Sequence, residues 1–160
     1  PVIAIARDQG IKVALFGATD ESLRRSAQAM EKKYPGLSVV LTLAPAMGFD
    51  PNGAAADEAI KEIGESGAQF VLLALGAPKQ EQFAARAQTA LPFAGFMSIG
   101  AGLDFISGAQ VRAPKWVRKL ALEWLWRLAS NPRRLAARYG SCIAILPKLT
   151  LRAWQAGRSA

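Results

Sequence analysis

Four short apolar runs constrain the fold of this chain more than any other feature of the sequence. They occupy residues 13–16, 37–43, 70–75 and 96–99, and none shows a regular alternation of apolar and polar residues. A strand with one face in water alternates in this way, whereas a strand that is covered on both faces does not. The four runs are therefore predicted to be strands of a buried, parallel sheet.

Helical patterns separate the four runs. Apolar residues recur at helical spacing in residues 20–34, 53–66 and 79–90, and the residues before position 13 also read as a helix. Strands that alternate with helices favour a parallel sheet with helices on both faces, and so we predict an α/β, Rossmann-like core. The residues expected to face inward are Leu23, Ala27 and Met30 in the first of these three helices and Ala56, Ala59, Ile60 and Ile63 in the second.

The charge is distributed unevenly along the chain, whose 160 residues carry a net charge of +8. Residues 1–110 hold 9 Lys and Arg against 11 Asp and Glu, a net charge of −2. Residues 111–160 hold 11 Lys and Arg against the single acid Glu123, a net charge of +10. Such a basic segment suggests an anionic partner, such as phospholipid, polyphosphate or nucleic acid. We accordingly divide the chain into a core, residues 1–110, and a basic helical appendage, residues 111–160.

The predicted appendage combines cationic and aromatic residues. Residues 115–129 place apolar side chains on one helical stripe beside basic ones, and all four tryptophans lie in the appendage, at positions 116, 124, 126 and 154. Tryptophan and cationic residues on amphipathic helices are typical of binding to the headgroup layer of an anionic membrane. A helical cap packed on the sheet explains the pattern equally well, and both interpretations can hold on different faces. The apolar stripe could also form a subunit interface in an oligomer.

The absence of histidine excludes several kinds of catalytic site. Ser-His-Asp and Cys-His arrangements and histidine-ligated metals all require it. The single cysteine, Cys142, excludes an internal disulfide and a multi-cysteine zinc site. We expect no metal and no cofactor. No apolar run reaches the roughly 20 residues that span a bilayer.

Three loops are candidates for a ligand site, because ligands of open parallel sheets bind beyond the carboxyl ends of the strands. The first loop follows Gly17, where a helix N-terminus could favour a phosphate. Asp20 and Glu21 fill the first turn of that helix and satisfy the same dipole. An ordinary capped helix is therefore the alternative interpretation of this loop.

The second and third loops carry more distinctive residues. Residues 76–81 (GAPKQE) follow the third predicted strand, form a tight turn and open a helix. Lys79 could face a diphosphate, and the Gln80 amide could pair with a nucleobase edge or a sugar hydroxyl. The third loop, residues 100–105 (GAGLDF), has part of a dinucleotide fingerprint, and Asp104 could bind a hydroxyl there. A plain turn or helix cap is the alternative for both loops.

Several longer motifs occur in one order along nearly the whole chain. The motifs are residues 76–81, residues 99–105 with Gly108, residues 112–116 (RAPKW), residues 122–128 (LEWLWRL), residues 131–135 (NPRRL) and Arg138 with Tyr139. Together they closely resemble the motifs of the WecG/TagA/CpsF family, which is glycosyltransferase family 26. The strand and turn at residues 13–17 and the turn at residues 34–36 also fit this family.

The resemblance implies a specific reaction. It implies an inverting, metal-independent transfer of a hexose or N-acetylhexosamine from a UDP-sugar, often UDP-N-acetylmannosamine, to a polyprenyl-diphosphate-linked sugar. It also implies a role in bacterial surface or exopolysaccharide synthesis, a cytoplasmic location at the inner face of the bacterial membrane, and no nucleic-acid partner. The chain holds no Asp-x-Asp pair, so helix dipoles and basic side chains would have to stabilise a departing diphosphate.

The resemblance also assigns roles to residues of this chain. The donor site would be formed by loop and helix-start residues, namely Gly17, Gly76, Pro78, Lys79, Gln80, Glu81, Gly100, Gly102 and Asp104. The acceptor, its diphosphate or the membrane would be contacted by residues of the appendage, namely Arg112, Trp116, Arg127, Arg133, Arg134 and Arg138.

The sequence departs from the family in one respect. Family members carry a further N-terminal region with an aspartate proposed as the general base, and no segment of this chain matches it. Asp50 does not fit that motif, so the catalytic base is not assigned. We therefore expect this chain, as an N-terminally truncated enzyme, to be inactive or severely impaired by itself. Two alternatives stay open, a nucleotide-binding protein without catalysis and a nucleic-acid-binding module that uses the basic appendage.

Overall fold

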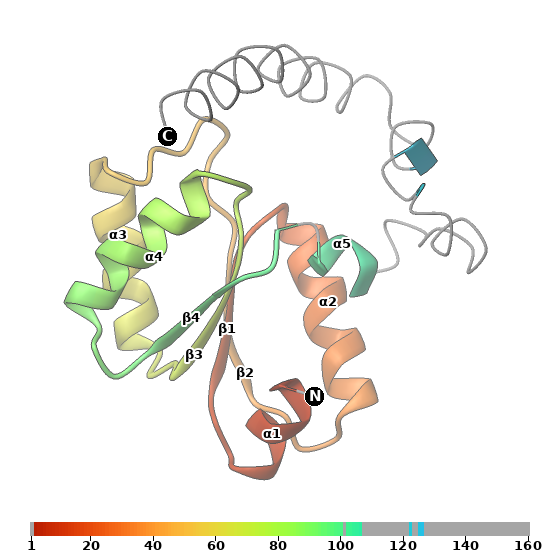
Figure 1. Cartoon of the computed structure of the whole chain (residues 1–160). Helices are drawn as coiled ribbons and strands as arrows, with labels where there is room; N and C mark the ends of the chain where they lie inside the picture. Colours follow the sequence, from red (N-terminus) through yellow and green to blue (C-terminus); the bar gives the residue numbers. More distant parts are fainter. Residues whose placement is uncertain (1, 101, 107–121, 123–124, 127–160) are drawn as a thin grey trace, which may run out of the picture. The chain divides into compact units, whose positions relative to one another are not determined.

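The computed structural model of the chain describes residues 2–100, 102–106, 122 and 125–126. Within these residues the sheet has four strands in the order β2-β1-β3-β4 (Figure 1). β1 (Val13–Gly17) lies between β2 (Val39–Leu43) and β3 (Phe70–Ala74), and β4 (Gly95–Ser98) pairs with the other edge of β3. Every neighbouring pair is parallel, as the unbroken apolar runs predict.

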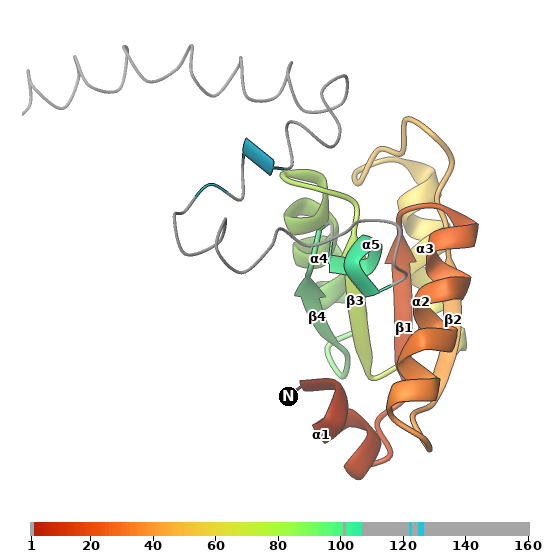
Figure 2. The same cartoon turned by 90° about the vertical axis from the view of Figure 1, so that its right-hand side faces the viewer.

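Helices cover both faces of this sheet (Figures 1 and 2). α1 (Val2–Asp8), α2 (Asp20–Lys33) and α5 (Gly102–Ile106) pack on one face, whereas α3 (Ala54–Glu65) and α4 (Lys79–Ala90) pack on the other. The predicted Rossmann-like α/β fold is therefore confirmed. The Trp-rich appendage lies almost wholly outside the described residues, and its boundary at residue 110 stays a prediction.

The central strand β1 shows why its sequence does not alternate. Val13 and Leu15 belong to the apolar cluster beneath α1, α2 and α5, while Ala14 and Phe16 belong to the cluster beneath α3 and α4. None of these four side chains is more than 1% exposed. Because both faces of the strand are buried, every position favours an apolar residue.

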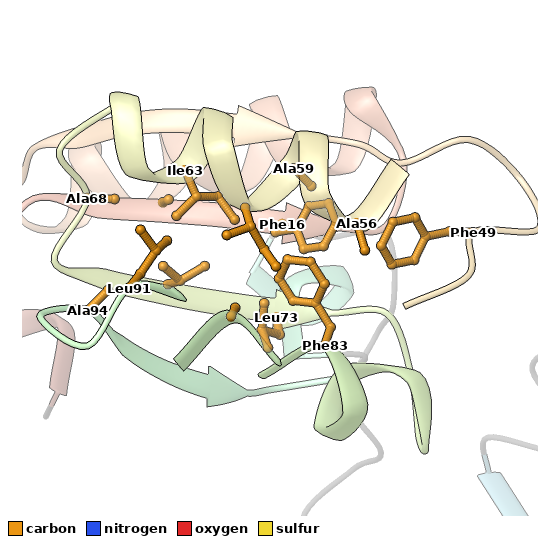
Figure 3. Packing of buried hydrophobic residues seen from close by; sticks show 14 residues of the cluster. Phe16, Phe49, Ala56, Ala59, Ile63, Ala68, Leu73, Phe83, Leu91 and Ala94 are labelled. Carbon is orange, nitrogen blue, oxygen red and sulfur yellow. The ribbon is translucent and has the colours of Figure 1, made fainter. Parts of the chain in front are cut away.

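Three phenylalanines form the part of the core that is nearest to the carboxyl ends of the strands (Figure 3). Phe16 comes from β1, Phe83 from α4, and Phe49 from the loop between β2 and α3. The ring centroids are 4.6 Å apart for Phe16 and Phe83, 5.4 Å for Phe16 and Phe49, and 5.9 Å for Phe49 and Phe83. These separations are typical of favourable aromatic pairs. Phe49 thereby fixes its loop to the sheet.

The main difference from the sequence-based expectation is α5. Residues 100–105 are predicted to form a loop, but a helix begins at Gly102, so Asp104 lies inside a helix. Leu103 is fully buried in the cluster with α2, and the hydroxyl of Ser26 donates a 3.1 Å hydrogen bond to its carbonyl oxygen. This short helix is thus held by contacts with a distant part of the chain rather than by its own sequence.

Candidate functional site

The order of the strands marks one place where a ligand is expected to bind. β1 continues through α2 to β2 on one side, whereas β3 continues through α4 to β4 on the other, and the two helices lie on opposite faces. The chain therefore leaves β1 and β3 in opposite directions. Such a topological switch point is where open α/β sheets bind ligands, beyond the carboxyl ends of the strands. All three predicted loops lie at this edge of the sheet.

Gly17 has a packing role at the switch point. A Cβ atom on this residue would lie 2.6 Å from the carbonyl carbon of Ala74 in β3, and the φ angle of Gly17 is +109°. The next residue, Ala18, donates a 3.1 Å backbone hydrogen bond to the Ala74 oxygen. The ends of β1 and β3 are therefore in direct contact, which only glycine permits.

The helix after this loop is capped by the chain itself. The hydroxyl oxygen of Thr19 accepts a 3.3 Å hydrogen bond from the Ser22 amide, and Asp20 and Glu21 occupy the first turn of α2. A side-chain cap and two carboxylates occupy the positive end of the helix dipole. This geometry favours the capped-helix interpretation of the first loop, and a donor-binding role of Gly17 stays a prediction.

The second loop leads into α4 without a side-chain cap. Pro78 is the N-cap residue and offers no side-chain hydrogen bond, and the Ala77-Pro78 peptide bond is cis. The backbone N–H of Gln80 donates a 3.1 Å hydrogen bond to the carbonyl oxygen of Gly76. Gly76 adopts a φ of +81°, and apart from its chain neighbours no atom of a described residue lies within 4 Å of the place where its Cβ would be. The predicted tight turn is confirmed, and it leaves open space at the N-terminus of α4.

Gln80 connects the second loop to the third. Its side chain is only 8% exposed, and its Nε2 donates a 2.8 Å hydrogen bond to Oε1 of Glu81. The Gln80 Oε1 atom is buried and has no hydrogen-bond partner among the described residues. A Cβ atom on Gly100 would lie 4.0 Å from this oxygen. The structure therefore brings together two predicted donor-site residues that are twenty positions apart.

Lys79 reaches a segment that the sequence analysis did not assign to the site. Its Nζ donates a 2.6 Å hydrogen bond to the carbonyl oxygen of Phe49, in the loop between β2 and α3. Lys79 forms no ion pair with any described residue. An ammonium group has three donors, so two are left for an anionic ligand.

Arg86 binds the same loop two turns further along α4. Its guanidinium donates to the carbonyl oxygens of Pro51 and Gly53, both at 3.3 Å, and to the carboxylate of Asp57 at the start of α3. Together with Phe49, the two cations of α4 fix residues 44–53 beside the N-terminus of α4. The sequence offers no local pattern that would reveal these contacts, because they join residues more than 25 positions apart.

Removing the Arg86 side chain is expected to destabilise this loop measurably. Arg86→Ala loses three charge-assisted hydrogen bonds from a side chain that is 31% exposed, so we expect it to cost about 1–2 kcal/mol in urea unfolding. Arg25→Ala is the control, because it breaks only an exposed pair with Glu21 and should cost less than about 0.5 kcal/mol. Equal costs for the two variants would show that Arg86 does not hold the loop.

Comparison with known proteins identifies the family. The sequence profile of the Glycosyl transferase WecG/TagA/CpsF family matches residues 1–160. The chain belongs to this family. The predicted resemblance is thereby confirmed.

A curated relative of the chain gives the comparison more detail. The chain is 28% identical over 135 residues to the N-acetylglucosaminyldiphosphoundecaprenol N-acetyl-beta-D-mannosaminyltransferase of Bacillus subtilis (strain 168). The matched segment covers 83% of this chain but 50% of the relative. The chain thus spans about half the length of the curated relative that it matches.

The remaining predicted site residues of this WecG/TagA/CpsF chain are only partly described. Gly102 and Asp104 lie in α5, but the side chain of Asp104 is not within the described part of the structure. Within the described part of the chain, no group of three or more His, Cys, Asp or Glu residues could hold a metal ion, and no helix is long and apolar enough to cross a membrane. The predicted acceptor or membrane residues all lie outside the described residues, namely Arg112, Trp116, Arg127, Arg133, Arg134 and Arg138.

Proposed function

We propose that this chain provides the nucleotide-sugar site of a glycosyltransferase. The enzyme would transfer a hexose or N-acetylhexosamine from a UDP-sugar to a polyprenyl-diphosphate-linked sugar in the synthesis of a bacterial surface or exopolysaccharide. The transfer would be inverting and would require no metal ion. Family membership supports the reaction class, and the name of the Bacillus relative supports a lipid-linked acceptor and an N-acetylhexosamine donor.

One observation supports the switch point as the donor site. The buried Gln80 oxygen faces Gly100 and has no hydrogen-bond partner among the described residues. The N-terminus of α4 has no side-chain cap, the Glu81 carboxylate in its first turn accepts a hydrogen bond from Gln80, and Lys79 pairs with no described carboxylate. Backbone amides at a helix N-terminus and a lysine ammonium are groups that bind phosphate oxygens. An acceptor for the base or sugar and donors for the diphosphate therefore occur together.

The basic appendage is proposed to meet the other anionic partners. Residues 111–160 carry a net charge of +10 and all four tryptophans, a composition that suits an anionic membrane surface. A lipid-linked diphosphate acceptor would be presented at that surface. We therefore propose that the enzyme acts as a peripheral protein at the inner face of the cytoplasmic membrane, with arginines of the appendage close to the acceptor diphosphate.

Binding of UDP tests this proposal directly. We expect calorimetry to show micromolar to millimolar binding of UDP by the chain, and the double variant Lys79→Ala, Gln80→Ala to bind at least about tenfold more weakly, because each substitution removes a polar group from the proposed site. Arg25→Ala is the control, since among the described residues this exposed residue of α2 pairs with Glu21 alone and should leave the affinity unchanged. A folded chain that binds no UDP would contradict the proposed donor site.

A further inference from the structure

The carboxamide of Gln80 has one defined orientation. Its Nε2 group donates to Oε1 of Glu81 at 2.8 Å. A carboxylate oxygen can only accept, so turning the amide by half a turn would place two acceptors against each other. Glu81 therefore holds the nitrogen of Gln80, and the oxygen is left on the side of Gly100.

A buried Gln80 oxygen without a hydrogen bond destabilises the folded chain. It is buried, it has no partner among the described residues, and Gln80 as a residue is only 8% exposed. Nearly all buried polar atoms in proteins are hydrogen-bonded, and an exception calls for an explanation such as a functional role or a water molecule. Gly100 has no side chain to block the approach of a donor to this atom.

We infer that the Gln80 oxygen accepts a hydrogen bond from the ligand, and that Glu81 is a positioning residue that fixes this polarity. The inference rests on the proposed function and specifies the chemistry of its site. Phosphate oxygens are acceptors and cannot pair with the Gln80 oxygen. The group that it binds is therefore an N–H or O–H donor, either the imide N–H of uracil or a hydroxyl of the transferred sugar. The structure thus assigns Glu81 to the orientation of Gln80 rather than to ligand contact.

Relative affinities for matched ligands test this inference. The ligands are UDP, N3-methyl-UDP, CDP and UDP-N-acetylglucosamine, and their binding to the whole chain is measured by calorimetry. N3-methyl-UDP lacks the imide N–H, and cytosine presents an acceptor in its place, so these two ligands report on the base. UDP-N-acetylglucosamine against UDP reports on the sugar. The variants are Gln80→Met, which keeps the length of the side chain, Glu81→Leu, and Glu81→Gln, whose amide oxygen can still accept from Gln80.

If the oxygen accepts a hydrogen bond from the base, the wild-type chain should bind UDP at least about tenfold more tightly than N3-methyl-UDP or CDP, and Gln80→Met should remove this preference. If it accepts a hydrogen bond from the transferred sugar, the same variant should instead remove a preference for UDP-N-acetylglucosamine over UDP. In either case Glu81→Leu should lower the preference as well, because the amide can then turn, while Glu81→Gln should keep it. A general loss of stability would lower the affinity for all four ligands alike and would not change the ratios of these affinities.

The opposite results would overturn the inference. If Gln80→Met keeps every affinity ratio of the wild-type chain, the buried oxygen accepts neither from the base nor from the transferred sugar, and the inference is wrong. If Glu81→Leu keeps the ratios while Gln80→Met loses them, Glu81 is not a positioning residue. A folded wild-type chain that binds none of the four ligands would overturn the proposed function itself, and this inference with it.

Discussion

Replacing Gly17 with alanine is expected to lower the free energy of unfolding by about 3 kcal/mol or more. The added methyl group would lie 2.6 Å and 2.8 Å from the carbonyl carbon and oxygen of Ala74 and 2.9 Å from the nitrogen of Leu75. These are backbone atoms of a strand end and cannot move aside as a side chain could. The φ angle of +109° adds a conformational cost, since alanine rarely adopts it. β1 and β3 would have to separate at the edge that carries the candidate site.

Gly48→Ala separates the two contributions to this cost. Gly48 has a similar φ of +89°, but in the described part of the chain only its sequence neighbours come within 4 Å of its missing Cβ. Its substitution should therefore show the backbone strain alone, about 1–2 kcal/mol. Urea unfolding of both variants gives the comparison, and calorimetry with UDP shows whether the separated strands also weaken the site. If Gly17→Ala costs no more than Gly48→Ala, the contact between β1 and β3 is not the reason for glycine at this position.

The fold could be predicted from the sequence because its determinants are local and repetitive. The run from Val13 to Phe16 is apolar at every position, and both of its faces prove to be buried. The four residues expected to face inward on α3 are all buried, because their spacing follows the helical period. On α2, Leu23 and Met30 are buried as expected, but the buried serines 22 and 26 were not predicted. Serine hydroxyls can bond to backbone carbonyls within a core, and periodicity of apolar residues does not reveal them.

The candidate site could be predicted only in part, because its geometry depends on contacts between distant segments. The sequence identified the loop at residues 76–81 and the glycine at position 100, and these do lie together. It did not predict that Lys79 donates to the Phe49 carbonyl, or that Arg86 holds the same loop. It also did not predict that the Glu81 carboxylate accepts a hydrogen bond from Gln80, and a contact of Glu81 with the ligand stays a prediction. Motif spacing gives the residues of a site, but tertiary contacts decide which atoms are left for a ligand.

The loop at residues 44–53 illustrates how core packing and the candidate site depend on each other. Phe49 places its ring against those of Phe16 and Phe83 and its carbonyl oxygen against Lys79. A change in the aromatic cluster is therefore expected to alter the N-terminus of α4, although none of the three rings is among the predicted donor-site residues. A substitution in the core should affect both stability and affinity.

Phe83→Ala is the substitution that tests this dependence, and we expect it to cost about 3–5 kcal/mol. The Phe83 side chain is 0% exposed, and its ring centroid lies 4.6 Å from that of Phe16 and 5.9 Å from that of Phe49. Its removal leaves a cavity against both rings, so the transfer cost and the cavity cost add. Phe49 loses one of its two aromatic neighbours, and the Phe49 carbonyl should hold Lys79 less firmly. We therefore expect weaker UDP binding even under conditions in which the variant is folded.

Phe93→Ala provides a control with the same change of side chain. Phe93 lies in the turn before β4 and is 61% exposed, so its truncation should change the free energy of unfolding by no more than about 0.5 kcal/mol. Urea unfolding and UDP calorimetry on both variants complete the comparison. A stability loss for Phe83→Ala with unchanged affinity would mean that the loop keeps its place without the aromatic cluster, and that the hydrogen bonds from Lys79 and Arg86 are sufficient to hold it. A loss of both would show that the core beneath α4 determines the geometry of the site.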